Sequence, residues 1–162
     1  MKDKITIYTD GSCLGNPGAG GYGAVIILSP THRIAFHGGE KLSTNNKMEL
    51  MAVIEALKYV LEHREDNNYE IDLYTDSNYV KLGIEVWIHS WKKNNWRTAS
   101  KKAVKNQDLW KKLLFLTEQF QHIAWHWVKA HNNHYYNELC DQLANKAAQE
   151  QVVDFTFVDV LE

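Results

Sequence analysis

The sequence contains few cysteines, no long apolar run and little net charge. Its two cysteines, Cys13 and Cys140, share no short spacing, and we interpret them as free thiols of a reducing cytosol, with a disulfide left open by sequence alone. No apolar stretch approaches the length of a membrane-spanning helix, and the N-terminus "MKDKITIYTD" lacks the apolar region of a secretion signal. These absences predict a cytoplasmic monomer with no membrane association and no obligate protein partner.

The net charge of −2 does not by itself indicate a nucleic-acid-binding protein, but the charge is unevenly distributed. Between Trp91 and Lys112 there are eight Lys or Arg and one acid, whereas the rest of the chain holds ten positive and nineteen negative residues. A lysine run is most often a solvated surface. Because Trp91 and Trp96 alternate with the positive charges, we favour a phosphate-binding surface over residues 91–105, called the basic segment below.

The remaining composition is that of one globular domain. The chain has 162 residues, of which 44% are hydrophobic and 23% charged. We predict a domain over residues 1–150 and a tail over residues 151–162 that the pattern does not place. A glycine-rich loop is expected over residues 11–23. Alternating and apolar runs predict strands over 5–9, 24–28, 34–42, 69–75 and 122–128, and helices over 45–63, 106–120 and 137–150, with short helices from 77 to 91. This order indicates an α/β fold with a mixed five-stranded sheet flanked by helices.

Two of the predicted strands lie in similar segments, "ITIYTDGS" around Asp10 and "IDLYTDSN" around Asp76, which share Ile, Tyr, Thr and Asp at matching positions. Four shared letters are too few for a structural repeat. A single aspartate after a strand is most often a turn former or a helix N-cap. Two matching phrases instead favour a functional pair, because the carboxyl ends of parallel strands are where α/β sheets build their sites.

Two further acids are candidates for the same site. Glu49 shares a helical stripe with Val53, Ala56 and Val60, which predicts that it faces the core, although a first-turn glutamate can simply serve the helix dipole. Asp141 lies at the edge of the apolar face of the last predicted helix, where a solvated acid is the ordinary interpretation. Together, the four carboxylates would form an all-oxygen site of the kind that Mg²⁺ prefers.

Five segments extend this hypothesis beyond single residues. In chain order they are "YTDGSCLGNPG", "TNNKMEL", "YTDSNYV", "WIHSWKKNNWRTASKKAVKNQDLW" and "WVKAHNNHYYNELCD". They closely resemble segments of bacterial type 1 ribonuclease H, over roughly residues 4 to 148. The resemblance implies the ribonuclease H fold, with the first and fourth strands adjacent and parallel. It also implies hydrolysis of the RNA strand of RNA–DNA hybrids through two Mg²⁺ ions, or Mn²⁺, with 5′-phosphate and 3′-hydroxyl products.

The resemblance also assigns roles to individual residues. Asp10, Glu49, Asp76 and Asp141 match the metal-binding carboxylates, and His131 matches a loop histidine for proton transfer or product release. Within the loop, Ala130 and Asn133 replace typical glycines and Tyr135-Tyr136 replaces a common Pro-Glu, which narrows backbone freedom and puts loop mobility in doubt. Substrate-binding positions are matched by Cys13, Asn16, Thr44, Asn45, Asn46, Asn78, Trp87, Lys92, Lys93, Lys101, Lys102 and Trp110.

Each of these substrate assignments has a simpler alternative. The asparagines are also turn residues, the tryptophans are about as well explained by core packing, and the lysines by solvation. At the level of function, the alternatives are a non-catalytic module that binds hybrids or double-stranded RNA, and a different nuclease of the same superfamily. Four intact carboxylates argue against a mere binder, since acids near phosphate weaken binding.

Overall fold

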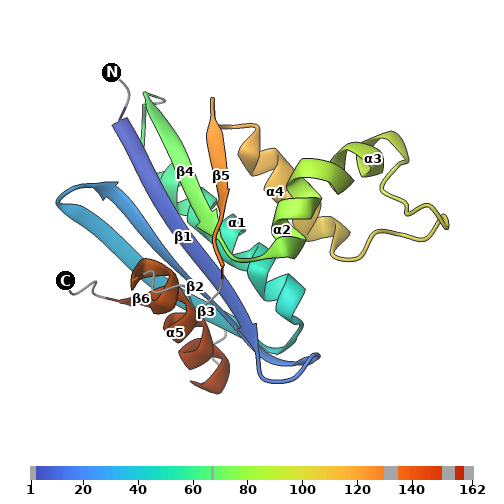
Figure 1. The fold of residues 1–162 in the computed structure, drawn as a ribbon, viewed down its shortest axis with the longest axis horizontal. Helices are drawn as coiled ribbons and strands as arrows, with labels where there is room; N and C mark the ends of the chain where they lie inside the picture. Colours follow the sequence, from blue (N-terminus) through green and yellow to red (C-terminus); the bar gives the residue numbers. More distant parts are fainter. Residues whose placement is uncertain (1–2, 67, 130–134, 151–155, 159–162) are drawn as a thin grey trace.

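The computed structural model describes residues 3–66, 68–129, 135–150 and 156–158, and it has one sheet with helices on both faces (Figure 1). The sheet order is β5-β4-β1-β2-β3-β6. The strands are β1 (Asp3–Cys13), β2 (Gly18–Ser29), β3 (His32–Ser43), β4 (Tyr69–Thr75), β5 (Ile123–Trp127) and β6 (Thr156–Val158). The helices are α1 (Asn45–His63), α2 (Asn78–Leu82), the π-helical turn η1 (Gly83–Trp87), α3 (Ile88–Lys93), α4 (Gln107–Thr117) and α5 (Tyr135–Glu150). No helix in these described ranges is long and apolar enough to cross a membrane.

The sheet is mixed, as the sequence predicts. β1, β2 and β3 form an antiparallel meander, while β4 pairs with β1 and β5 pairs with β4 in parallel. The register between β1 and β4 sets Thr9 opposite Thr75, so the next residues, Asp10 and Asp76, lie at the same edge of the sheet. The predicted adjacency of the first and fourth strands is therefore confirmed.

The prediction of five strands was one strand short. β6, from the C-terminal tail, pairs antiparallel with β3 and sets Phe157 opposite Phe36. A three-residue strand held by pairing with a segment about 120 positions away has too little local pattern to be read from sequence alone.

The predicted glycine-rich loop was too long, because β1 continues to Cys13 and β2 begins at Gly18. Glycine serves a packing role in this part of β2. A Cβ atom on Gly21 would lie 2.1 Å from the carbonyl oxygen of Ala144, so only glycine lets α5 lie this close to the sheet.

Helix α1 covers the opposite face of the sheet from α5, as Figure 1 shows. Thr44 caps it, with its hydroxyl oxygen accepting a hydrogen bond from the backbone nitrogen of Lys47 at 3.2 Å. The predicted core-facing stripe is confirmed, since Val53, Ala56 and Val60 are fully buried and Glu49 is nearly so. This packing carries a carboxylate into the interior of the protein.

The basic segment is attached to the domain through tryptophan rings. Trp91 packs against Trp87, Trp96 and Trp110, with ring centroids 5.4–6.0 Å apart. Gly83 makes this packing possible, because a Cβ atom there would lie 1.9 Å from the Trp110 ring. The interleaved tryptophans thus anchor a segment whose lysines are exposed.

Candidate metal centre and nucleic-acid groove

Three carboxylates from three different elements meet at the edge of the sheet. Asp10 lies near the carboxyl end of β1, Asp76 follows β4, and Glu49 projects from the first turns of α1. One oxygen atom from each lies within 4.8 Å of the others. The parallel register of β1 and β4 places the two aspartates, and the close packing of α1 on β1 adds the glutamate.

The carboxylates of Asp10 and Glu49 are buried, that of Asp76 is half-buried, and the three repel one another. Burial, together with the charges of Glu49 and Asp76, raises the pKa of Asp10 to about 10. Burial and the charge of Asp76 likewise raise the pKa of Glu49. A carboxylate cluster of this kind favours protonation in the absence of a counter-charge, so a divalent cation is the natural partner of its ionised form.

The donor set fits a hard divalent cation. The Oε2 atom of Glu49 is buried and accepts no hydrogen bond within the part of the chain that the structure describes. Asp10 Oδ1 accepts one bond, from the backbone nitrogen of Gly11 at 2.9 Å. Buried carboxylate oxygens that protein donors leave unsatisfied are available to a metal ion, and all-oxygen sites suit Mg²⁺, Mn²⁺ and Ca²⁺.

The fourth predicted carboxylate lies beside this group. Asp141, on α5, lies near enough that its charge raises the pKa of both Asp10 and Glu49. It is less buried than Asp10 and Glu49. The structure therefore brings all four predicted carboxylates to one place, with Asp141 at the margin.

The predicted loop histidine, His131, lies outside the described residues, as do Ala130 and Asn133. The tyrosines that follow them begin α5. The Tyr136 ring packs against the Tyr8 ring at 5.2 Å, and the Tyr136 hydroxyl accepts a hydrogen bond from Arg33. Tyr136 therefore links the start of α5 to β1, the strand that carries Asp10.

A groove of about 500 Å³ brings together three of the predicted substrate residues. Asn16, Thr44 and Asn46 line it together with Pro17, Tyr79, Lys105 and Asn106. A second hollow of about 490 Å³ shares Asn106 with the first and reaches Lys47 and the start of α4. Polar side chains from the β1–β2 turn, the start of α1 and the basic segment thus line two neighbouring hollows.

Tyr79 and Asn106 line this groove, but the sequence analysis did not single them out as substrate-binding residues. The hydroxyl of Tyr79 accepts hydrogen bonds from the Asn106 side chain at 3.2 Å and from the Trp110 indole at 2.9 Å. These residues are far apart in sequence, and only packing of α2 against α4 joins them. A tyrosine in a short helix has no local signal that would separate this role from ordinary packing.

The other predicted substrate residues differ in how accessible they are. Trp110 is fully buried, so of the two roles considered for it, the structure supports core packing rather than substrate contact. Trp87 is half-buried. The Cys13 thiol is half-buried and donates to the carbonyls of Gly18 and Ser43, and both cysteines are free, as predicted. The side chains of Asn45, Asn78, Lys92, Lys93, Lys101 and Lys102 are exposed.

Asn16 also has the turn-forming role that the sequence analysis gave as its alternative. Its side-chain oxygen accepts a hydrogen bond from the backbone nitrogen of Asn45 at 3.1 Å, which ties the β1–β2 turn to the start of α1. This bond leaves the side-chain amide nitrogen of Asn16 facing the groove region as a donor. Turn chemistry and substrate contact are therefore compatible at this position.

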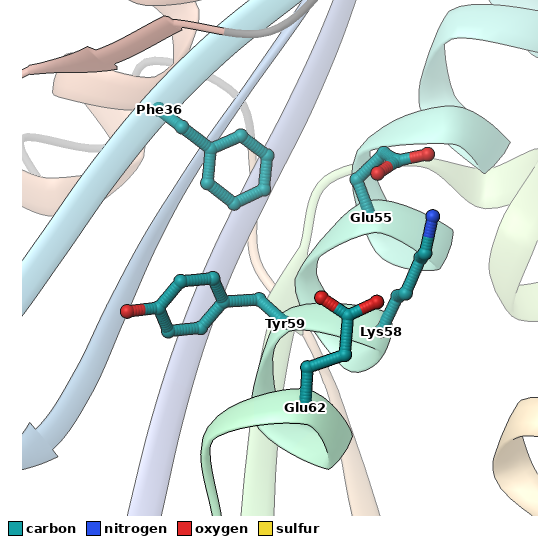
Figure 2. Close-up of a pocket in the computed structure, with 5 residues that line it drawn as sticks. All are labelled: Phe36, Glu55, Lys58, Tyr59 and Glu62. Carbon is teal, nitrogen blue, oxygen red and sulfur yellow. The ribbon is translucent and has the colours of Figure 1, made fainter.

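A much smaller pocket lies away from the carboxylates, between β3 and α1 (Figure 2). The rings of Phe36 and Tyr59 line one side, and the charged side chains of Glu55, Lys58 and Glu62 line the other. Its volume of about 30 Å³ suits a single water molecule and excludes a nucleic acid.

Comparison with known proteins agrees with this arrangement. The family model described as RNase H matches residues 2–149. The chain belongs to the RNase H family. Ribonuclease H of Polynucleobacter asymbioticus is 53% identical over 146 residues, which cover 90% of each chain.

Solved RNase H structures show the same fold. LC9-RNase H1, a type 1 RNase H with the type 2 active-site motif, superposes with a TM-score of 0.83 at 30% identity, over 99% of this chain and 79% of its own. LC11-RNase H1, solved in complex with an RNA/DNA hybrid, has a TM-score of 0.67 at 21% identity, over 90% of this chain and 97% of its own. At that identity, the second likeness shows the fold alone.

Proposed function

We propose that this RNase H family protein hydrolyses the RNA strand of RNA–DNA hybrids, leaving 5′-phosphate and 3′-hydroxyl ends. The observation that carries the proposal is the convergence of Asp10, Glu49 and Asp76 within 4.8 Å. Proteins named ribonuclease H that are about half identical over nearly the whole chain support it. A hybrid-binding module with no catalysis would gain nothing from acids buried beside a phosphate path.

The carboxylates would hold divalent ions, for which we propose Mg²⁺, with Mn²⁺ as a substitute and two ions when substrate is bound. Such ions, when bound, supply Lewis acidity toward a phosphodiester and make water a better nucleophile. The protein's own contribution is to fix the carboxylate oxygens. Asp10 is held by the Gly11 backbone nitrogen, and Glu49 by packing of α1 in the interior. Preorganised oxygens of this kind need little rearrangement when the ions bind.

Substrate recognition would combine the groove and the basic segment. Hybrid duplexes are close to A-form and expose 2′-hydroxyls in a wide minor groove, so short polar donors such as Asn16 and Asn46 suit the RNA strand. Exposed Lys92, Lys93, Lys101 and Lys102 would contact phosphates without reading sequence. His131 stays a proposed proton-transfer or product-release residue, and a cytoplasmic monomer stays a prediction.

A cleavage assay on matched substrates tests the proposal. End-labelled RNA–DNA hybrid, single-stranded RNA, double-stranded RNA and double-stranded DNA are compared with and without Mg²⁺, using the wild type, Asp10→Asn and the exposed control Glu62→Gln. We expect cleavage of the hybrid only, dependent on Mg²⁺, lost in Asp10→Asn and retained in Glu62→Gln. Metal-independent binding with no cleavage would support the binding module instead, and cleavage of DNA duplex would point to another nuclease.

A further inference from the structure

A neutral side chain on α5 links the marginal carboxylate to the end of β1. Asn145 lies one helical turn after Asp141, and its side-chain nitrogen donates a hydrogen bond to Asp141 Oδ2 at 3.3 Å. Its side-chain oxygen accepts a hydrogen bond from the Ser12 hydroxyl at 2.5 Å. All three residues are half-buried. Ser12 is two residues after Asp10 on the same strand, so this chain of bonds spans the metal centre from β1 to α5.

The direction of these hydrogen bonds is set by the chemistry of the amide. A carboxamide has an acceptor end and a donor end, and an ionised carboxylate can only accept. With the Ser12 hydroxyl on its oxygen, Asn145 presents its N–H₂ group to Asp141. Rotating the amide by 180° would set its oxygen against the carboxylate and lose the bond to Asp141, whereas the Ser12 hydroxyl could still accept from the rotated amide. The acceptor-only carboxylate therefore selects the amide orientation, and the Ser12 hydroxyl satisfies the amide oxygen on the other side.

Asp141 depends on such support more than the other carboxylates do. Asp10 is held by the β1 register and Gly11, and Glu49 is nearly enclosed by α1 and the sheet. Asp141 instead projects from α5 and is only half-buried. A neutral donor can orient it without adding a positive charge that would repel a divalent ion.

We propose that Asn145, anchored by its hydrogen bond to Ser12, is a positioning residue that holds the Asp141 carboxylate toward Asp10 for divalent-ion binding. The inference rests on the metal centre of the proposed function. It implies that one oxygen of Asp141 is engaged by protein and the carboxylate is held in place before ions and substrate arrive. Outer partners of metal ligands typically change metal affinity or activity by about 10–100-fold when removed.

Calorimetric titration of the substrate-free protein with Mn²⁺ is the direct test, because it does not depend on catalysis. The variants are Asn145→Ala, Ser12→Ala and Ser12→Thr, with Gln149→Ala as a matched control from the exposed side of α5. We expect Asn145→Ala to weaken Mn²⁺ binding about 10-fold, and Ser12→Ala to do so by a smaller factor. Ser12→Thr retains the hydroxyl and should bind Mn²⁺ with near wild-type affinity.

Two further measurements separate a positioning role of Asn145 from a general effect on stability: hybrid cleavage over a series of Mg²⁺ concentrations up to saturation, and thermal melting. We expect the KM for hybrid to stay within about twofold and the Mg²⁺ concentration for half-maximal rate to rise in step with the Mn²⁺ dissociation constant. The double variant Ser12→Ala/Asn145→Ala should be no worse than Asn145→Ala alone, because both changes remove the same interaction.

The inference is overturned if Asn145→Ala binds Mn²⁺ as tightly as Gln149→Ala, or if the effects of Ser12→Ala and Asn145→Ala simply multiply. Should Asn145→Ala fail to fold, the Ser12→Ala and Ser12→Thr pair decides the matter, since the same loss of Mn²⁺ affinity in both would remove the role of the hydroxyl. A wild-type protein that binds Mn²⁺ but cleaves no hybrid would refute the proposed function and leave this test intact.

Discussion

Gly11 of β1 and Glu49 of α1 pack backbone against backbone. A Cβ atom on Gly11 would lie 2.5 Å from the Glu49 backbone nitrogen and 2.6 Å from the Met48 carbonyl carbon, so no other residue fits there without displacing the helix. This closeness brings the Glu49 carboxylate over the end of β1. The metal centre thus depends on a residue with no side chain as well as on its acids.

Gly11→Ala should therefore damage the site through geometry alone. Pushing α1 away from β1 costs about 1–3 kcal/mol of stability, as overpacking in cores generally does. We expect a lower melting temperature and weaker Mn²⁺ binding together, measured by calorimetry and thermal melting. Glu49→Gln provides the contrast, since it should lose Mn²⁺ binding without the packing penalty. Wild-type stability and affinity in Gly11→Ala would contradict the close packing described here.

Stability without divalent ions should fall as pH rises. The pKa of Asp10 is raised from 3.8 to about 10, so above pH 4 the native state retains a proton that the unfolded chain has released. The native state binds more protons, hence the free energy of unfolding declines with pH until about 10 and is insensitive to this group below about 4. Added Mg²⁺ should restore more stability at pH 8 than at pH 5.

Removing the ionisable group of Asp10 tests the origin of that pH dependence. Asp10→Asn should raise the melting temperature at pH 8 in the absence of metal, because the native state no longer has to take up a proton there, by about 2–4 °C for each kcal/mol gained, while abolishing hybrid cleavage. The slope of melting temperature against pH should flatten between pH 5 and 9. Glu62→Gln, an exposed acid on α1, should leave that slope unchanged. An equal flattening in both variants would mean that the cluster is not its source.

The basic segment should account for much of the salt dependence of hybrid binding. Double substitution of Lys92 and Lys93 to Ala, or of Lys101 and Lys102 to Ala, removes up to two phosphate contacts and should reduce the log–log salt slope by up to about 2. Binding by catalytically inactive Asp10→Asn protein, measured across a salt series, gives the slope. Double substitution of Lys58 and Lys146 makes the same charge change away from the segment. Equal slopes in all three doubles would remove the segment from the binding surface.

Phe157 should anchor the short strand β6. Its ring contacts the rings of Phe36 and Tyr59 edge-on, with centroids 6.3 and 5.8 Å apart, although the side chain is about half exposed. Figure 2 shows the two partner rings together beside α1. Phe157→Ala should lower the free energy of unfolding by about 1–2 kcal/mol in urea melts. Thr156→Ala, in the same strand but with no ring to lose, should change it little; equal effects would argue against ring anchoring.

Local patterns correctly predicted much of the fold. The core-facing position of Glu49 followed from its spacing to Val53, Ala56 and Val60, because helical periodicity decides which side chains are buried. The position of Asp76 directly after β4 followed in the same way, whereas Asp10 lies within β1, which continues to Cys13. The burial of Trp110 did not, since a tryptophan beside lysines suits either a core or a substrate surface, and only Gly83 and Tyr79, distant in sequence, resolve the choice.

The sequence by itself determined which acidic residues were candidates for the site and which helices and strands contain them. It could do so because helical periodicity and turn chemistry depend on residues only a few positions apart. Only the tertiary structure decided that three of those acids lie within 4.8 Å, that Asn145 reaches Asp141 from one side and Ser12 from the other, and that the tail adds a sixth strand. These contacts bring together segments that are far apart in the sequence. Their distances depend on how closely helices and strands pack, as at Gly11 and Gly21, which no local pattern records.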